Sequence, residues 1–161
     1  MKLMILVATV LMSSMAVAAM PTIGDYAQYE VTVTQGEAQS AMTFEQEITA
    51  FNQASNSYSV KSTVTSNGQV QTQLRNVESN SLFTTELVTQ ALANCTQAGG
   101  QSESVTTAAG TFDTCALPLT ASNGVTGKIN VGLVAFGVVR SEVVSGNQRT
   151  LAVLKSQRLG Q

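Results

Sequence analysis

The two cysteines are the residues of this chain whose chemistry is easiest to define. Cys95 and Cys115 flank a stretch rich in Gly, Ser and Thr, and the sequence contains no histidine. Zinc takes three or four ligands, so only carboxylates could complete a zinc site here, which is an unusual choice for this metal. A redox pair is typically C-x-x-C, and a thiol nucleophile usually needs a histidine base. The expected use is therefore a structural disulfide between Cys95 and Cys115, with free thiols as the alternative.

No other residues form a recognisable catalytic, metal or cofactor site. Lys61 and Lys128 have hydroxyls nearby in the sequence, but a solvated strand lysine is the simpler interpretation of each. Glu45 and Glu47 point the same way on a strand, yet away from the apolar residues beside them, so they should face water. The charges are few and scattered, without a basic stripe for nucleic acid. We therefore expect no enzyme, no metal, no cofactor and no nucleic-acid partner.

The N-terminal segment has the layout of a secretory signal peptide. Lys2 is followed by an apolar run at 3–12 and a region of mostly small residues at 13–19. Cleavage after Ala18 or Ala19 fits this pattern, and we favour Ala19; an uncleaved anchor is the alternative. The sequence thus predicts a signal peptide at 1–19 and a single β-rich domain at 20–161. We expect a bacterial periplasmic or secreted protein, in a compartment where thiols become disulfides, without a transmembrane span after cleavage.

Most of the chain beyond residue 20 alternates between apolar and polar residues, which predicts β-strands. Asn67 and Gly68 join two such segments, and both central positions of a type I′ hairpin turn favour positive φ. Gly110 is expected to supply the positive φ of another tight turn. Pro118 predicts that its strand is at an edge or irregular there. Gly132 and Gly137 interrupt later strand patterns and indicate bends or bulges.

One segment follows a helical pattern instead. Apolar residues recur at helical spacing in TTELVTQALANC, where Thr84 or Thr85 can cap the N-terminus. They are Leu87, Val88, Ala91 and Leu92. The whole pattern predicts eight or nine strands in hairpin order and one helix, which favours an antiparallel meander.

Two segments of the C-terminal half resemble a group of bacterial exported proteins of unknown function. The matching stretches are SVTTAAGTFDTC at 104–115 and FGVVRSEVV at 136–144. The resemblance implies a mainly β fold, in which a curved antiparallel sheet forms an open half-barrel around one helix. Such a fold is similar to the periplasmic carriers of lipoproteins. It implies no catalytic residues.

A half-barrel leaves a concave face that one helix need not fill, so we expect a non-enzymatic envelope protein that binds a lipid or apolar ligand there. The candidate contact residues are Phe44, Ile48, Val131 and Leu133. A structural or assembly component of the bacterial envelope, acting through an envelope protein partner, is the main alternative. An outer-membrane barrel and an enzyme rank below these two.

Overall fold

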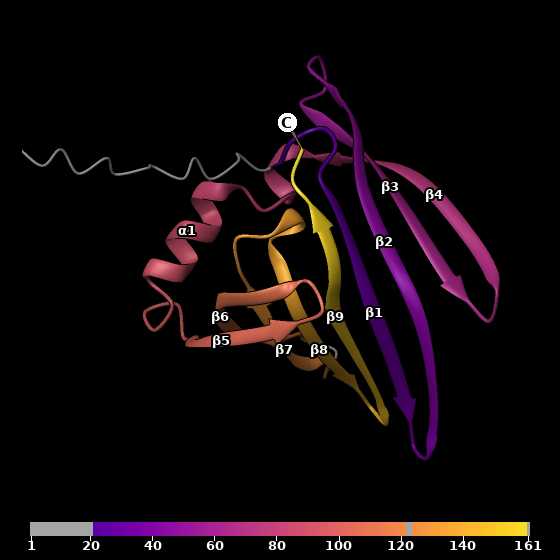
Figure 1. Ribbon diagram of the computed structural model, residues 1–161. Helices are drawn as coiled ribbons and strands as arrows, with labels where there is room; N and C mark the ends of the chain where they lie inside the picture. Colours follow the sequence, from indigo (N-terminus) through magenta and orange to yellow (C-terminus); the bar gives the residue numbers. More distant parts are fainter. Residues whose placement is uncertain (1–20, 122–123, 161) are drawn as a thin grey trace, which may run out of the picture.

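Figure 1 shows the computed structural model, which describes residues 21–121 and 124–160. The predicted signal peptide at 1–19 lies outside the described residues. Within them, nine antiparallel strands form one open sheet accompanied by a single α-helix, so the predicted fold class is confirmed. The elements are β1 (Tyr26–Gln35), β2 (Ala38–Asn52), β3 (Ser57–Ser66), β4 (Gln69–Glu78), α1 (Thr85–Ala93), β5 (Gln101–Thr107), β6 (Gly110–Thr120), β7 (Thr126–Val131), β8 (Val138–Ser145) and β9 (Gln148–Arg158).

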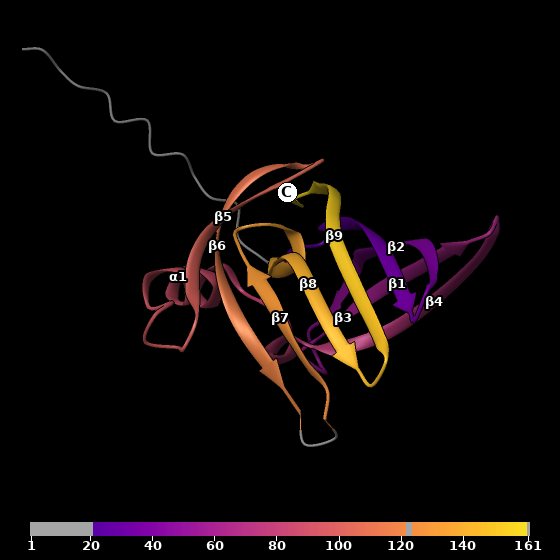
Figure 2. The same ribbon diagram turned by 90° about the horizontal axis from the view of Figure 1, so that it is seen from below.

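The strand order is β4-β3-β2-β1-β9-β8-β7-β6-β5, which joins two meanders side by side. β1 to β4 form one meander and β5 to β9 form the other. They meet where β1 pairs antiparallel with β9, from Tyr26 opposite Arg158 to Gln35 opposite Gln148. β4 and β5, although joined in the chain through α1, lie at opposite edges. Figure 2 shows the sheet curled into a trough, with β5 and β6 on one side and β3 and β4 on the other.

The predicted turns and bends occur where the sequence indicated them. Asn67 and Gly68 both have positive φ, at 50° and 76°, and Gly110 has a φ of 136°. Pro118 lies beyond Ala116, the last residue of β6 that pairs with β5, so β6 is an edge at that point. The β7 register shifts beside Val131, next to the first predicted bend. These irregularities let a meander of regular strands curl.

α1 begins where the sequence predicted. The hydroxyl of Thr84 accepts a hydrogen bond from the backbone nitrogen of Leu87 at 3.1 Å, so Thr84 is the N-cap. Val88 is fully buried against Val131 of β7. Leu87 is 48% exposed, however, although we expected it on the apolar face. The reason is that Val88, Ala91, Leu92 and Cys95 form the helical stripe that meets the sheet, and Leu87 lies at its margin.

The predicted disulfide is confirmed. Cys95 lies just after α1 and Cys115 in the middle of β6, with 5.5 Å between their Cα atoms. Both are buried, at 2% and 0% exposure. The bond therefore attaches the C-terminal end of the helix to the sheet. Gly100 packs against it so closely that a Cβ there would lie 2.7 Å from the Sγ of Cys115.

None of the helices formed by the described residues is long and apolar enough to cross a membrane.

Candidate functional site

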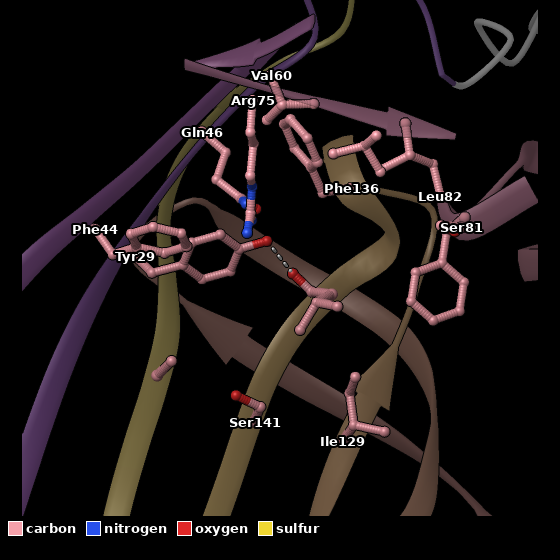
Figure 3. Close-up of a pocket in the computed structure, with 14 residues that line it drawn as sticks. Tyr29, Phe44, Gln46, Val60, Arg75, Ser81, Leu82, Ile129, Phe136 and Ser141 are labelled. Atoms are coloured by element: carbon pink, nitrogen blue, oxygen red, sulfur yellow. Dashed lines mark hydrogen bonds between the residues drawn. The ribbon is translucent and has the colours of Figure 1, made fainter. Parts of the chain in front are cut away.

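A cavity of about 440 Å³ opens on the concave face of the sheet (Figure 3). Its volume lies within the range of about 300–1,000 Å³ that is typical of small-molecule sites. Residues from both meanders contribute to it, together with the segment between β4 and α1. The lining consists of Tyr29, Phe44, Gln46, Val60, Arg75, Val77, Ser81, Leu82, Phe83, Ile129, Phe136, Val138, Ser141 and Ala152.

Tyr29 and Phe44 form an aromatic wall of the cavity. They are direct partners in the β1–β2 ladder, and their stacked ring centroids lie 6.3 Å apart. The hydroxyl of Tyr29 donates a hydrogen bond to the carbonyl oxygen of Val138 at 3.0 Å, which ties β1 to β8. Burial raises the pKa of Tyr29 well above its usual value. The phenol therefore remains neutral and engaged, and it serves as wall rather than as acid or base.

Phe136 reaches the cavity from a strained connection between β7 and β8. Its φ is 62°, in the left-handed region that bulky residues rarely adopt. The connection is fixed by a hydrogen bond from the nitrogen of Gly132 to the oxygen of Gly137 at 3.0 Å, and by one from the nitrogen of Ala135 to Oε1 of Gln157 at 2.8 Å. Strain of this kind persists where the surroundings enforce it, often at binding sites. Here it accompanies the placement of an aromatic ring at the cavity wall (Figure 3).

Gly137 allows a second aromatic residue to approach this connection. Its φ is 70°, and a Cβ at this position would lie 2.6 Å from the Cβ of Phe83. A side chain other than hydrogen would therefore push Phe83 away. Phe83 comes from the segment before α1, so Gly137 keeps that segment close to the sheet.

Arg75 is the single charged residue among the side chains that line the cavity. It lies on β4 opposite Val60 of β3, and both face the trough. None of the ion pairs among residues 21–121 and 124–160 involves Arg75. The cavity thus combines aromatic and aliphatic walls with one positive charge that lacks a carboxylate partner.

The structure brings one of the four predicted contact residues to the cavity. Phe44 lines it. Ile48 is 1% exposed and pairs with Val60 in the interior. Val131 is fully buried beneath α1, and Leu133 packs in the same cluster. The alternation of β2 pointed to Phe44 correctly, but it does not distinguish residues that line a cavity from residues that fill a core.

Several cavity residues were missed by the sequence reasoning. Phe83 and Phe136 lie outside the strands, where alternation gives no direction for the side chain. Arg75 carried a usable signal, because it lies two residues before Val77 and so shares its face of β4. That signal was overlooked because few other residues of the strand are apolar.

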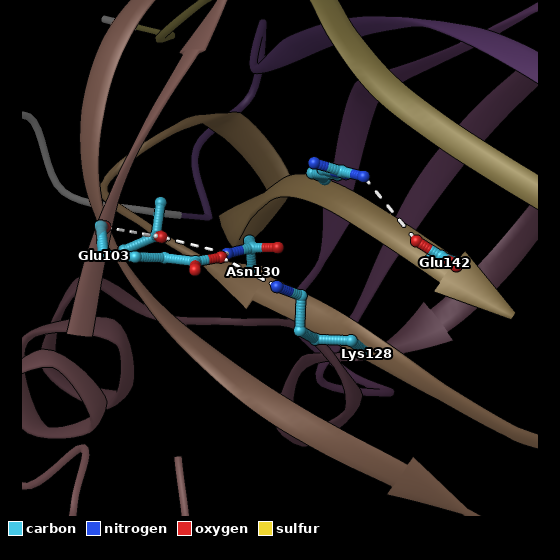
Figure 4. A network of polar contacts seen from close by, with 6 residues as sticks. Glu103, Lys128, Asn130 and Glu142 are labelled. Atoms are coloured by element: carbon cyan, nitrogen blue, oxygen red, sulfur yellow. Dashed lines mark hydrogen bonds and ion pairs between the residues drawn. The ribbon is translucent and has the colours of Figure 1, made fainter. Parts of the chain in front are cut away.

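A polar network ties β5, β6 and β7 together away from the cavity (Figure 4). Glu103 accepts from Nζ of Lys128 at 3.0 Å and from Nδ2 of Asn130 at 2.6 Å. The same amide donates to Oγ1 of Thr114, whose hydroxyl donates to the backbone oxygen of Glu103. The hydrogen bond from Asn130, followed by that from Lys128, lowers the pKa of the Glu103 carboxyl.

Glu142 of β8 extends this polar surface. It pairs with Arg149 at 2.8 Å and with Arg140 at 3.6 Å, and the hydrogen bond from Arg149 is the main reason that its pKa is lowered. The groups around Glu103 and Glu142 saturate one another, which is the arrangement of a structural network. In the part of the chain that the structure describes, no three His, Cys, Asp or Glu residues are grouped so as to hold a metal.

No known protein family and no curated protein matches the chain. Solved structures with a similar course of the chain include an exported protein with a YmcC-like fold from Bacteroides fragilis (12% identity, 85% of this chain and 96% of that chain, TM-score 0.45). MucB, solved in complex with MucA, is 10% identical over 85% of this chain, which spans about half (51%) of MucB (TM-score 0.44). A LolA superfamily protein from Nitrosomonas europaea is 10% identical over 88% of both chains, with a TM-score of 0.32. Because every TM-score is below 0.5, we base no functional conclusion on these likenesses.

Proposed function

We propose that this protein is a non-enzymatic binding module of the bacterial envelope that holds a lipid or other apolar ligand on the concave face of its sheet. The observation that carries the proposal is the cavity of about 440 Å³, into which the rings of Tyr29, Phe44, Phe83 and Phe136 are gathered. Sites for small molecules are concave and mostly apolar, with few polar groups for orientation. This cavity has that composition.

The position of α1 supports the proposal. Val88 packs on Val131 at the β6–β7 end of the trough, and the disulfide fixes the end of the helix there. Ile129 contacts both the helix cluster and the cavity, so the two lie on the same face of the sheet. The helix therefore closes one end of the trough and leaves the remainder open.

The groups in the cavity favour binding over catalysis. Ser81 and Ser141 line it, but no histidine or carboxylate stands among the lining residues to activate them. The phenol of Tyr29 is occupied by Val138. The disulfide and the predicted signal peptide at 1–19 support a periplasmic or secreted location.

Dye binding to two matched variants tests the proposal. Phe44→Ala removes a ring from the cavity, whereas Phe51→Ala removes one from the same strand where it is 39% exposed and outside the lining. We expect the affinity for a fluorescent apolar dye to fall about tenfold or more in Phe44→Ala, because one buried aromatic contact is lost, and to stay unchanged in Phe51→Ala.

Native mass spectrometry of the protein purified from the periplasm provides the independent readout. A bound mass that extracts into organic solvent is the expected result. A ligand-free mass together with no dye binding would remove the carrier function, as would equal dye affinity in both variants.

The outer edge of the sheet supports a second candidate, a partner-binding role in envelope assembly. β4 is an edge strand and is exposed along almost its whole length, with Val70 at 63% and Leu74 at 64% exposure. A free edge can accept a strand from a partner chain. A photocrosslinking residue at position 74 should then capture one protein in cells; absence of a discrete crosslinked product would exclude this role.

A further inference from the structure

The cavity continues as a groove along β3 and β4 toward the turn at Asn67 and Gly68. A hollow of about 430 Å³ shares Phe44 and Arg75 with the cavity. A third hollow of about 330 Å³ shares Val64 and Gln71 with the second. The trough is thus lined without interruption from Phe136 to the tip of the β3–β4 hairpin.

The lining changes character along this groove. The deep end is aromatic and aliphatic, whereas the β3–β4 part is lined largely by amides and hydroxyls. The polar side chains there are Ser62, Ser66, Asn67, Gln69, Gln71, Thr72 and Gln73. An apolar pocket that opens into a polar groove matches a molecule with an apolar tail and a polar head.

Arg75 stands at the boundary between the two parts. It lines both the cavity and the adjoining hollow, and Figure 3 shows its side chain directed toward Gln46 and the rings of Tyr29 and Phe44. Neither lining contains a carboxylate. In the described residues, by contrast, four other basic side chains each pair with a glutamate: Lys128, Arg140, Arg149 and Arg158.

We propose that the ligand is a single-chain amphiphile with an anionic head, held with its tail between Phe44 and Phe136 and its head on Arg75. A guanidinium offers a planar fork of donors that matches a carboxylate or a phosphate. The cavity lies toward the small end of the usual range for ligand sites, which suits one chain rather than several. This inference rests on the proposed carrier function and names its ligand class.

Displacement of the apolar dye by four probes of equal chain length tests it. Dodecanoate and dodecyl phosphate carry anionic heads, dodecanol a neutral one and dodecyltrimethylammonium a cationic one; all are used below the concentrations at which they form micelles. For the unaltered protein we expect at least one anion to displace the dye at about one tenth of the dodecanol concentration. The ammonium probe should be the weakest. Added salt should reduce the anion preference because Arg75 is accessible to solvent.

Arg75→Gln should remove the anion preference and leave dodecanol binding unchanged. Lys61→Gln is the matched control, because it makes the same charge change on the neighbouring strand. Lys61 pairs with Leu74 and so faces the other side of the sheet from Val60 and Arg75. The control should retain the full preference.

The outcomes separate the two proposals. If dodecanol binds as tightly as both anions, or if Arg75→Gln keeps the preference, the head-group inference is wrong and the carrier function stands. If none of the four probes binds, the carrier function itself fails. Preference for dodecanoate over dodecyl phosphate would identify a carboxylate head, and the reverse order a phosphate head; either one supports the inference when it depends on Arg75.

Discussion

The two sides of the trough differ in how they are held. On the side of β5 to β7, the buried Val88 of α1 packs on Val131, and a disulfide anchors the helix to β6. On the side of β3 and β4, β4 is almost entirely exposed, and no helix of the described residues covers it. We call these the closed side (α1 and β5 to β7) and the open side (β3 and β4).

This difference explains how one small sheet can be both stable and hollow. A half-barrel whose only helix lay along the middle of the trough would fill its own concavity. Here a covalent bond and a compact cluster confine the helix to one end, so stability is concentrated there. Binding surfaces are usually drawn from the less stable parts of a protein, and the open side meets that condition.

Removal of the disulfide should have the largest effect on this comparison. Replacement of Cys95 and Cys115 by alanine releases a loop of 20 residues' separation. The expected loss is about 3 kcal/mol in the free energy of unfolding by the loop-entropy relation. Urea unfolding measures it, and hydrogen exchange should show greater loss of protection in α1 than in β3.

Reductant is the control for this experiment. It should lower the stability of the unaltered protein toward that of the double variant and leave the double variant unchanged. Equal loss of protection in α1 and β3 would show that the two sides unfold as one unit, and the distinction between them would then have no energetic basis.

Two alanine substitutions sharpen the comparison at the level of single side chains. Val88→Ala removes two methyl groups from the fully buried helix cluster of the closed side. Leu74→Ala removes a larger side chain from the open side, where it is 64% exposed. We expect a loss of about 2 kcal/mol for Val88→Ala and less than about 0.5 kcal/mol for Leu74→Ala, measured by urea unfolding. A cost for Leu74→Ala similar to that for Val88→Ala would mean that β4 is packed against something other than water.

The sequence was sufficient for the local structure on both sides. Alternation predicted the strands, Asn67 and Gly68 predicted their turn, and Thr84 was one of the two proposed caps. Each of these features depends on a few neighbouring residues. The disulfide was also predictable, because two cysteines permit a single pairing.

The candidate site was predictable only in part, because it depends on contacts between distant segments. The pairing of β1 with β9 decides which strands curl around the trough, and no local pattern specifies it. Ile48 and Val131 have the same strand signature as Phe44, yet they fill the core. Phe136 reaches the cavity through a left-handed backbone that alternation cannot anticipate. The sequence therefore indicated the lined face and not the lining.

Acid should loosen the two sides unequally, with a smaller effect than the substitutions above. Glu103 and Glu142, the two carboxyls whose pKa is lowered, lie on β5 and β8, at and beside the closed side. A carboxyl with a lowered pKa stabilises the fold above its unfolded pKa, and this contribution is lost as the pH falls through its folded value. Both side chains are partly exposed, so we expect less than about 1 kcal/mol between pH 7 and 3.

Glu103→Gln tests the acid effect directly. The amide keeps an oxygen that can accept from Asn130 and Lys128, but it does not titrate. The variant should therefore lose less stability than the unaltered protein when the pH falls from 7 to 3, as measured by urea unfolding at each pH. Glu37→Gln, the same change in the exposed turn between β1 and β2, should leave the pH dependence as it was. If the Glu37 variant flattens the acid limb as much as the Glu103 variant does, general charge repulsion rather than the network on β5 to β7 governs the response to acid, and pH does not distinguish the closed side from the open one.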